Sequence, residues 1–407
     1  MAVSDPPEQE PPAPGLEEAK QKVIEEVERR ADLLVDVSHR IHERPELLFE
    51  ERFAADLVAG ALEDGGLDVQ RGAYGLDTAL AARAGEPDAR GPTVTVICEY
   101  DALPRIGHAC GHNIIAAAGL GAALTAASVA DTLEGRLLVL GTPAEEGGGG
   151  KIILAERGAF DGVDAAMMVH PAGLDLTEPD AIAVASLRVQ YHGRGAHAAA
   201  CPEQGRNALD AAVLGYMAVA ALRQHVAPSE RVHGIFLEAG EKPNVVPDHT
   251  LAEWYVRSGT IASLQPLKAR VLACLEGGAT AAGCRMEWAP AAPEYSDLRT
   301  NGPLVELYGA NSAALGRPLS EPSAHRKVTA STDMGNISHL VPSIHPLVAA
   351  APPDVSLHSG EFATWAASPQ GDRAVLDGAK AMAMTVVDLW ARPHAMAEVR
   401  AAFDPDT

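Results

Sequence analysis

The sequence predicts an α/β protein with an open, mostly parallel sheet, interrupted by a smaller inserted domain. Three apolar runs, at 93–100, 136–142 and 165–171, alternate with segments of helical pattern at 113–133 and 151–160. Runs that are apolar throughout, rather than at every second residue, are typical of parallel strands buried on both faces. Strands that alternate with helices are the pattern of an open α/β sheet. A chain of 407 residues is long for one hydrophobic core, so we expect two domains.

The residues before the sheet predict a tail and two helices. Residues 1–15 contain five prolines, which predicts a disordered tail. They have neither the basic region nor the apolar core of a secretory signal, so we expect a cytoplasmic protein. Apolar residues spaced three to four apart predict one helix over 16–44, ended by Pro45, and another over 50–66. No apolar run reaches the length of about 18 residues that a membrane span needs.

A second domain is predicted within 186–297, because the pattern of strands and helices changes there. The segment reads as strand, helix, two strands, helix and strand, which is the order of a ferredoxin-like α+β domain. From 298 the chain returns to α/β-type sequence, ending in a helix over 372–391. We therefore expect one α/β domain built from 16–185 and 298–407, with the smaller domain inserted between them.

Composition excludes several classes of protein. The five cysteines are scattered without a C-x-x-C pair, which argues against a disulfide framework, a zinc ribbon or a thioredoxin-like site. The formal net charge of −23 argues against nucleic-acid binding, because phosphate backbones are held by clusters of Lys and Arg.

Metal-binding side chains follow the predicted strands where those strands end. Asp101 ends the first run, and the loop after it reads "GHACGH" over 107–112. Glu145 and Glu146 follow the second run, and His170 lies at the end of the third. Because ligands of open α/β sheets bind beyond the carboxyl ends of the strands, we expect these groups to converge.

The donor set predicts a catalytic metal centre. Thiolate, imidazole and carboxylate together suit Zn²⁺, and more ligands than one ion needs suggest two divalent ions. One of Glu145 and Glu146 can bind metal while the other stays free as a general base toward activated water. Asp101 is expected to orient a ligand histidine. Taken alone, Cys110 would more often be a small buried apolar residue, and the two glutamates a solvated helix start.

Five ordered motifs resemble one enzyme family. "EYDALPRIGHACGHN", "GTPAEEGGGGK", "MMVHP", "GRGAHAAACPEQGRNALDA" and "NVVPD" appear in this order. The chain therefore resembles the dinuclear-metal aminoacylase and amidohydrolase peptidases, which include hippurate and auxin-conjugate hydrolases. "EYDALP" with "STDMGN" is most similar to the branch of aminobenzoyl-glutamate hydrolases and β-alanyl-lysine dipeptidases. The implied fold is a zinc-exopeptidase-like catalytic domain with a ferredoxin-like satellite domain that mediates dimerisation.

The resemblance implies roles for particular residues. Cys110, His112, Glu146, His170 and a late histidine would hold the two ions, with Glu145 as the base. From the residues alone, His339, His345 and His358 are all candidates for the late ligand; "LHSGEF" matches the last motif of the family, which favours His358.

Four further positions match the family outside this ligand set. His197 resembles the histidine that reaches the active site of a dimer partner, where it would polarise the scissile carbonyl. Asn244, Arg257 and Asp333 are expected to contact substrate, and Arg257 could bind the product carboxylate. Asn113 stands where the wider family usually has Asp, which would change the charge near the metals.

The expected function is that of a metal-dependent amidohydrolase. It would act as a homodimer on an N-acyl amino acid or a dipeptide, of aminobenzoyl-glutamate or β-alanyl type. The thiolate favours Zn²⁺, with Mn²⁺ or Co²⁺ as alternatives at one position. Two other hypotheses are a non-catalytic binding protein that keeps the scaffold and a different enzyme with one structural metal; the spare Glu145 argues against the second.

Overall fold

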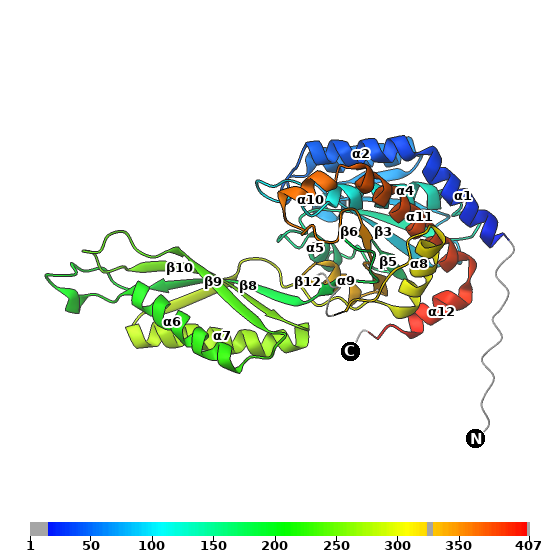
Figure 1. The fold of residues 1–407 in the computed structure, drawn as a ribbon. Coiled ribbons are helices and arrows are strands. Elements are labelled where there is room, and N and C mark those ends of the chain that lie inside the picture. The colour runs from blue at the N-terminus through cyan, green and yellow to red at the C-terminus, as the bar shows by residue number, and fades with distance from the viewer. Residues whose placement is uncertain (1–14, 324–328, 405–407) are drawn as a thin grey trace, which may run out of the picture. The chain divides into compact units, whose positions relative to one another are not determined.

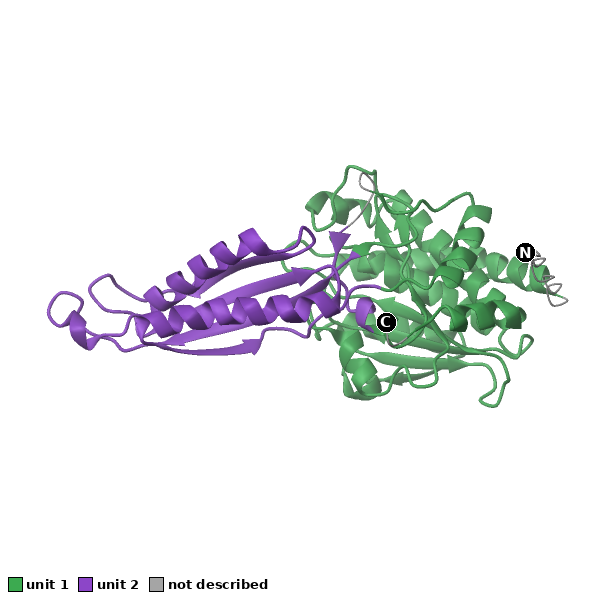
Figure 2. Ribbon diagram, turned by 90° about the horizontal axis from the view of Figure 1, so that it is seen from below, with its two compact units in different colours: residues 1–180, 299–328, 337–407 green, residues 181–298, 329–336 purple. Residues whose placement is uncertain are grey.

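The computed structural model describes residues 15–323 and 329–404. Contacts divide the chain into unit 1, comprising 1–180, 299–328 and 337–407, and unit 2, comprising 181–298 and 329–336 (Figure 2). The chain thus leaves unit 1 at 181–298, which form most of unit 2, and again at 329–336. The segment 329–336 belongs to unit 2 by its contacts, although the sequence placed it in the larger domain. Residues 1–14 of the predicted tail lie outside the described residues.

A mixed sheet of six strands forms the centre of unit 1. Its order is β1-β2-β4-β3-β5-β13. Strands β3 and β5 are labelled in Figure 1, where helices lie around them. The strands are β1 (Asp68–Arg71), β2 (Leu80–Ala84), β3 (Thr93–Glu99), β4 (Arg136–Thr142), β5 (Ala165–Met167) and β13 (Ser343–Ile344). The pairings β4–β3, β3–β5 and β5–β13 are parallel. The pairings β1–β2 and β2–β4 are antiparallel, so the expected parallel arrangement covers only this part of the sheet.

Helix α4 (His112–Ala127) is buried over nearly its whole length and carries a site residue at its start. It is rich in Ala, Gly and Ile on every side, as expected for a helix surrounded by protein. A Cβ atom at Gly119 would lie 2.5 Å from the carbonyl oxygen of Ile97 in β3, so only glycine allows this close approach. The approach brings the beginning of α4 to the carboxyl end of β3.

The other elements of unit 1 follow the sequence pattern with two differences. The single helix expected over 16–44 is two helices, α1 (Leu16–Arg29) and α2 (Ala31–Glu43), separated at Arg30. The third apolar run is divided into β5 and β6 (His170–Ala172). Further helices and one strand are α3 (Arg52–Asp64), α5 (Gly150–Glu156), α8 (Gly302–Ala314), β14 (Leu347–Ala349), α10 (Gly360–Trp365), α11 (Pro369–Ala391) and α12 (Pro393–Ala401). The short strands β7 (Asp180–Ala181) and β12 (Thr329–Ala330) and the short helix α9 (Met334–Ser338) lie where the chain passes between the two units.

Unit 2 has a four-stranded antiparallel sheet and two long helices. Its chain order is β8 (Ala183–His192), α6 (Ala208–Leu222), β9 (Arg231–Glu238), β10 (His249–Ser258), α7 (Ile261–Ala282) and β11 (Arg285–Pro290). This is the β-α-β-β-α-β order expected from the sequence. The sheet order is β11-β8-β10-β9, which leaves β9 at an edge. Buried residues such as Val189 and Trp254 form its separate core with α6 and α7.

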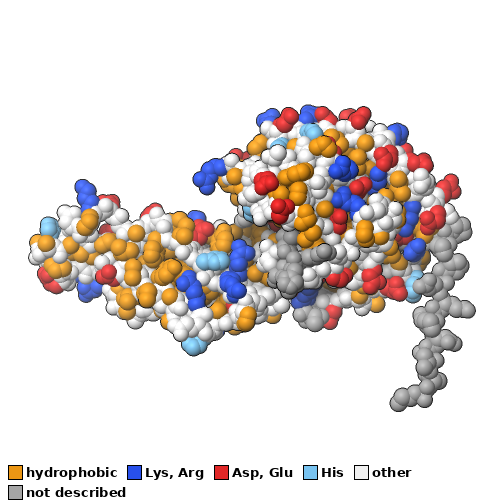
Figure 3. Space-filling view, in the orientation of Figure 1, with side chains coloured by type: hydrophobic (Ala, Val, Ile, Leu, Met, Phe, Trp, Pro, Cys, Tyr) orange, Lys and Arg blue, Asp and Glu red, His pale blue; other side chains and the backbone are white. Residues whose placement is uncertain are grey.

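Large apolar side chains are exposed on unit 2, where hydrophobic atoms gather on the face shown in Figure 3. On β9 these side chains include Ile235, which is 64% exposed, and Phe236; on α6 they include Met217, which is 60% exposed. Among the described residues, no helix is long and apolar enough to cross a membrane.

Candidate metal centre

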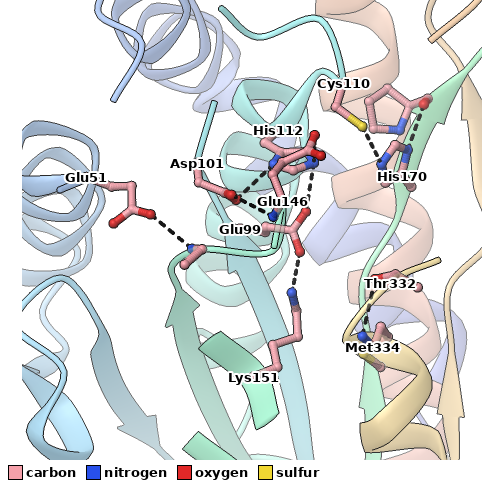
Figure 4. A network of polar contacts seen from close by, with 12 residues as sticks. Glu51, Glu99, Asp101, Cys110, His112, Glu146, Lys151, His170, Thr332 and Met334 are labelled. Atoms are coloured by element: carbon pink, nitrogen blue, oxygen red, sulfur yellow. Dashed lines mark hydrogen bonds and ion pairs between the residues drawn. The ribbon is translucent and has the colours of Figure 1, made fainter. Parts of the chain in front are cut away.

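Residues from four separate segments bring their metal-binding atoms together in unit 1. Cys110 Sγ lies 3.4 Å from His170 Nε2 (Figure 4). It also lies 3.3 Å from His358 Nε2. His358 Nε2 lies 3.4 Å from Glu146 Oε1. The ligand atoms of Cys110, His112 and His170 lie within 4.8 Å of one another, as do those of Cys110, Glu146 and His358. The predicted ligand set therefore forms one cluster.

His112 lies between the buried carboxylates of Glu99 and Asp101 and the partly buried carboxylate of Glu146. Its Nδ1 is 3.0 Å from Asp101 Oδ1, while its Nε2 is 3.1 Å from Glu99 Oε1 and 3.8 Å from Glu146 Oε1. A carboxylate that accepts a hydrogen bond from one ring nitrogen fixes the orientation of the imidazole and leaves the other nitrogen for a metal. Asp101 thus has the position expected of a residue that orients a ligand histidine.

Backbone geometry in the "CGH" loop explains its glycine. Gly111 precedes α4 with a φ of 77°, in the left-handed region that glycine adopts most readily. A Cβ atom there would lie 2.6 Å from Pro171 Cγ, next to His170. The segment that carries His358 is also bound to this loop, because the His358 N–H donates to the Ala109 carbonyl at 2.9 Å. The close approach of Gly111 to Pro171 and the hydrogen bond of His358 to Ala109 hold Cys110 close to His170 and His358.

Of the three late histidines, His358 has the position of a ligand. Its Nε2 approaches both Cys110 and Glu146. His345 is buried with its ring centroid 5.5 Å from that of His170, and neither of its ring nitrogens has a hydrogen-bond partner among the described residues. Among the described residues, His339 is in none of the groups of side chains that could together hold a metal ion.

The electrostatics of the cluster favour positive charge at its centre. Burial alone would lower the pKa of His112, but Glu99, Cys110 and Asp101 raise it well above 6.5. Burial raises the pKa of the Cys110 thiol well above 9, and Glu146 adds to this effect. His112 Nε2 and Glu146 Oε1 are buried without a hydrogen-bond partner in the described part of the chain. A divalent cation fits this donor set, because it would compensate both atoms and favour the thiolate.

Lys151 and Glu99 form a buried ion pair beside the cluster. Both side chains are at most 1% exposed. Glu99 ends β3, and Lys151 lies in the first turn of α5. Lys151 was not singled out from the sequence, so its position beside the metal-binding groups was missed. One sequence signal could have suggested the pair: a mainly apolar strand ends in Glu99, and Lys151 lies at the start of a mainly apolar helix.

Asn113 does not turn its side chain to the predicted ligands. Its amide nitrogen donates to Ser38 Oγ and to the Ala366 carbonyl, both at 2.9 Å. The side chain therefore connects α4 to α2 and to the end of α10. The interpretation that Asn in place of Asp changes the charge near the metals receives no support from these contacts.

The predicted base Glu145 is buried, and one of its carboxylate oxygens lies within 4.8 Å of ligand atoms of Glu99 and His112. The predicted site residues His197, Asn244, Arg257 and Asp333 belong to unit 2. His197 is exposed, and its Nδ1 accepts hydrogen bonds from the N–H groups of Ala199 and Ala200. This pattern leaves the proton on Nε2, which can then donate. Arg257 donates to Ser331 Oγ at 3.0 Å, and burial lowers the pKa of its guanidinium. Asn244 lies in the β9–β10 connection, and Asp333 is fully buried.

Comparison with known proteins identifies the family. The sequence profile of peptidase family M20/M25/M40 matches residues 98–376. The chain belongs to this family. It is 37% identical to the Xaa-Arg dipeptidase of Mus musculus over 400 residues, which is 95% of this chain and 93% of that protein.

Two further relatives extend the comparison. One of the two p-aminobenzoyl-glutamate hydrolase chains of Escherichia coli (strain K12) is 32% identical over 302 residues, or 67% of this chain and 61% of that protein. A dinuclear metal-binding peptidase of the M20 family from Bacillus subtilis has the same fold. It superposes with a TM-score of 0.68 at 20% identity, over 90% of this chain and 99% of that one.

Membership of the M20 family confirms the resemblance inferred from the motifs. The chain is a hydrolase, because its relatives are named as dipeptidase, peptidase and amidohydrolase. Nothing in the comparisons favours the alternative of a non-catalytic binding protein.

Proposed function

We propose that this M20 hydrolase cleaves the amide bond of a dipeptide or N-acyl amino acid with the help of two divalent metal ions. The observation that carries the proposal is the cluster itself. Cys110, His112, Glu146, His170 and His358 bring their donor atoms together, and Glu145, which is 8% exposed, lies next to them with a carboxylate oxygen near His112 and Glu99. Five donors exceed what one Zn²⁺ needs, and the thiolate favours Zn²⁺ for at least one position.

The residues of the chain have complementary roles in such a reaction. When bound, the metal ions would supply Lewis-acid activation of water and of the scissile carbonyl. Glu145 would take the proton from the attacking water and pass it to the leaving amine. Asp101 would hold His112 in the tautomer that presents Nε2 to a metal. His197, with its proton on Nε2, would donate to the carbonyl oxygen as negative charge develops there.

We infer that the substrate is a dipeptide with a basic C-terminal residue. The support is the Xaa-Arg dipeptidase, which matches nearly the whole chain at 37% identity. A p-aminobenzoyl-glutamate substrate is the second candidate, because the Escherichia coli relative is less similar and matches less of the chain. Arg257 is the candidate residue for binding the carboxylate of the released amino acid.

A substrate panel tests this function. The Zn²⁺- or Mn²⁺-loaded protein would be assayed with β-alanyl-arginine, β-alanyl-lysine, p-aminobenzoyl-glutamate and hippurate, with Glu145→Gln as the control. Cleavage of the basic dipeptides by the wild type, reduced about 100-fold or more in Glu145→Gln, is expected. No cleavage of any compound by the metal-loaded wild type, or equal cleavage by both proteins, would contradict the proposal.

We also propose that unit 2 is a ferredoxin-like satellite domain through which two chains form a homodimer. Its edge strand β9 leaves backbone groups available for pairing and carries the exposed Ile235 and Phe236. Mixing His197→Ala with Glu145→Gln tests whether His197 serves the partner chain. Recovered activity in the mixture is expected, while no recovery would confine each site to its own chain.

A further inference from the structure

The backbone next to Glu145 has an uncommon conformation. The chain turns between β4 and α5, and Ala144 in this turn has a φ of 58°. Left-handed backbone is uncommon for residues other than glycine, and it persists where surrounding contacts enforce it. Ala144 directly precedes Glu145 and lies two positions before Glu146, so its conformation sets the direction in which both glutamate side chains leave the turn.

A buried carboxylate from a distant segment binds this turn. Glu51, at the start of α3, is 0% exposed. Its Oε1 accepts hydrogen bonds from the N–H of Ala144 and from the N–H of Phe49, both at 2.9 Å. Figure 4 shows Glu51 reaching a backbone nitrogen of the turn. Phe49 also has left-handed backbone, with a φ of 60°. One carboxylate oxygen therefore binds the N–H groups of two left-handed residues that lie far apart in the sequence.

A second buried carboxylate binds the other side of Glu145. Asp101 Oδ2 accepts a hydrogen bond from the Glu146 N–H at 2.9 Å. The peptide N–H groups immediately before and after Glu145 are thus each bound by a buried carboxylate. Buried backbone N–H groups need a hydrogen-bond partner, and these two side chains supply it on both sides of Glu145. The backbone that carries Glu145 is held from both sides.

We propose that Glu51 is a positioning residue that holds Ala144 in its left-handed conformation and thereby directs Glu145 toward the substrate water. The inference rests on the proposed role of Glu145 as the base. Burial and the charge of Asp101 both disfavour an ionised Glu51, so its retention at this position costs stability. Such a cost is typical of residues that serve an active site.

The test compares three variants loaded with Zn²⁺. Glu51→Ala removes the acceptor, whereas Glu51→Gln keeps an oxygen that can accept both N–H groups. Glu46→Ala is the matched control: its carboxylate binds the Phe53 and Ala54 N–H groups in the same segment but does not contact the turn. For each variant kcat and KM for β-alanyl-arginine, the metal content and the melting temperature would be measured.

The expected result separates positioning from a general loss of structure. Glu51→Ala should lower kcat about 10- to 100-fold with KM changed by at most about twofold and with wild-type metal content. Glu51→Gln and Glu46→Ala should each keep kcat within about threefold of the wild type. Wild-type kcat in Glu51→Ala, an equal loss in Glu51→Gln, or a loss that only follows lost metal would overturn the inference. If Glu145→Gln also keeps wild-type kcat, the proposed function itself fails, which is a distinguishable outcome.

Discussion

The pKa of Glu51 leads to a prediction about stability as a function of pH. Burial raises this pKa from 4.5 to about 7. The folded protein therefore keeps this proton at pH values where the unfolded chain has already released it. It follows that the free energy of unfolding falls as the pH rises through the window from 4.5 to about 7. Replacement by glutamine removes this titration and keeps the size and acceptor oxygen of the side chain.

The magnitude follows from the size of the shift. A difference of about 2.5 pKa units corresponds to roughly 3 kcal/mol. Relative to the wild type, Glu51→Gln should gain about this much stability between pH 4.5 and pH 8. For a folding unit of this size, such a gain should raise the melting temperature of Glu51→Gln relative to that of the wild type by about 6–12 °C. Other titrating groups are common to both proteins, so they cancel in this difference.

The assay is thermal unfolding of both full-length proteins at several pH values from 4.5 to 8. Glu50→Gln, at the exposed neighbouring position, controls for the loss of one negative charge. A difference between Glu51→Gln and wild type that stays constant within about 1 kcal/mol over this range would refute the reasoning.

Three further predictions concern other residues. Asp101→Asn should weaken metal affinity about 10- to 100-fold, measured by competition with a chromogenic chelator, and unchanged affinity would argue against its orienting role. Lys151→Met should destabilise the protein by about 3–5 kcal/mol in urea unfolding, because the buried Glu99 loses the Lys151 ammonium, and Glu99→Gln in the same chain should restore most of the loss. If the single variant is as stable as the wild type, the pair does not stabilise the fold. Phe236→Glu should convert a dimer to a monomer, as measured by light scattering. The control Leu340→Glu, at an exposed position of unit 1, should leave the measured mass unchanged. If Phe236→Glu is still a dimer, the β9 surface is not the dimer interface.

Much of the fold could be predicted because burial constrains composition. Strands β3 and β4 are covered on both faces, so their sequences are apolar throughout and were recognised. Strand β1 is largely exposed and short, so the same criterion missed it and the antiparallel edge of the sheet with it. The break at Arg30 involves neither proline nor glycine, and the helical pattern continues across it, so the sequence carried no signal for two helices.

The candidate site was predictable only in part. Cys110 and His112 are close in sequence and follow a strand, so local pattern was enough to select them. The choice of His358 depended on the family resemblance, since no local feature separated it from His345. Glu51 was missed because its partner Ala144 is 93 residues away. A glutamate at a helix start is usually solvated, and only the fold shows that this one is buried against the turn.

The central claim is that Cys110, His112, Glu146, His170 and His358 hold two metal ions. It is tested most directly by elemental mass spectrometry of protein purified without chelating resin. About two divalent ions per chain, reduced in Cys110→Ala and in His170→Ala, are predicted. No bound metal in the wild type, even after incubation with Zn²⁺ or Mn²⁺, would contradict the claim.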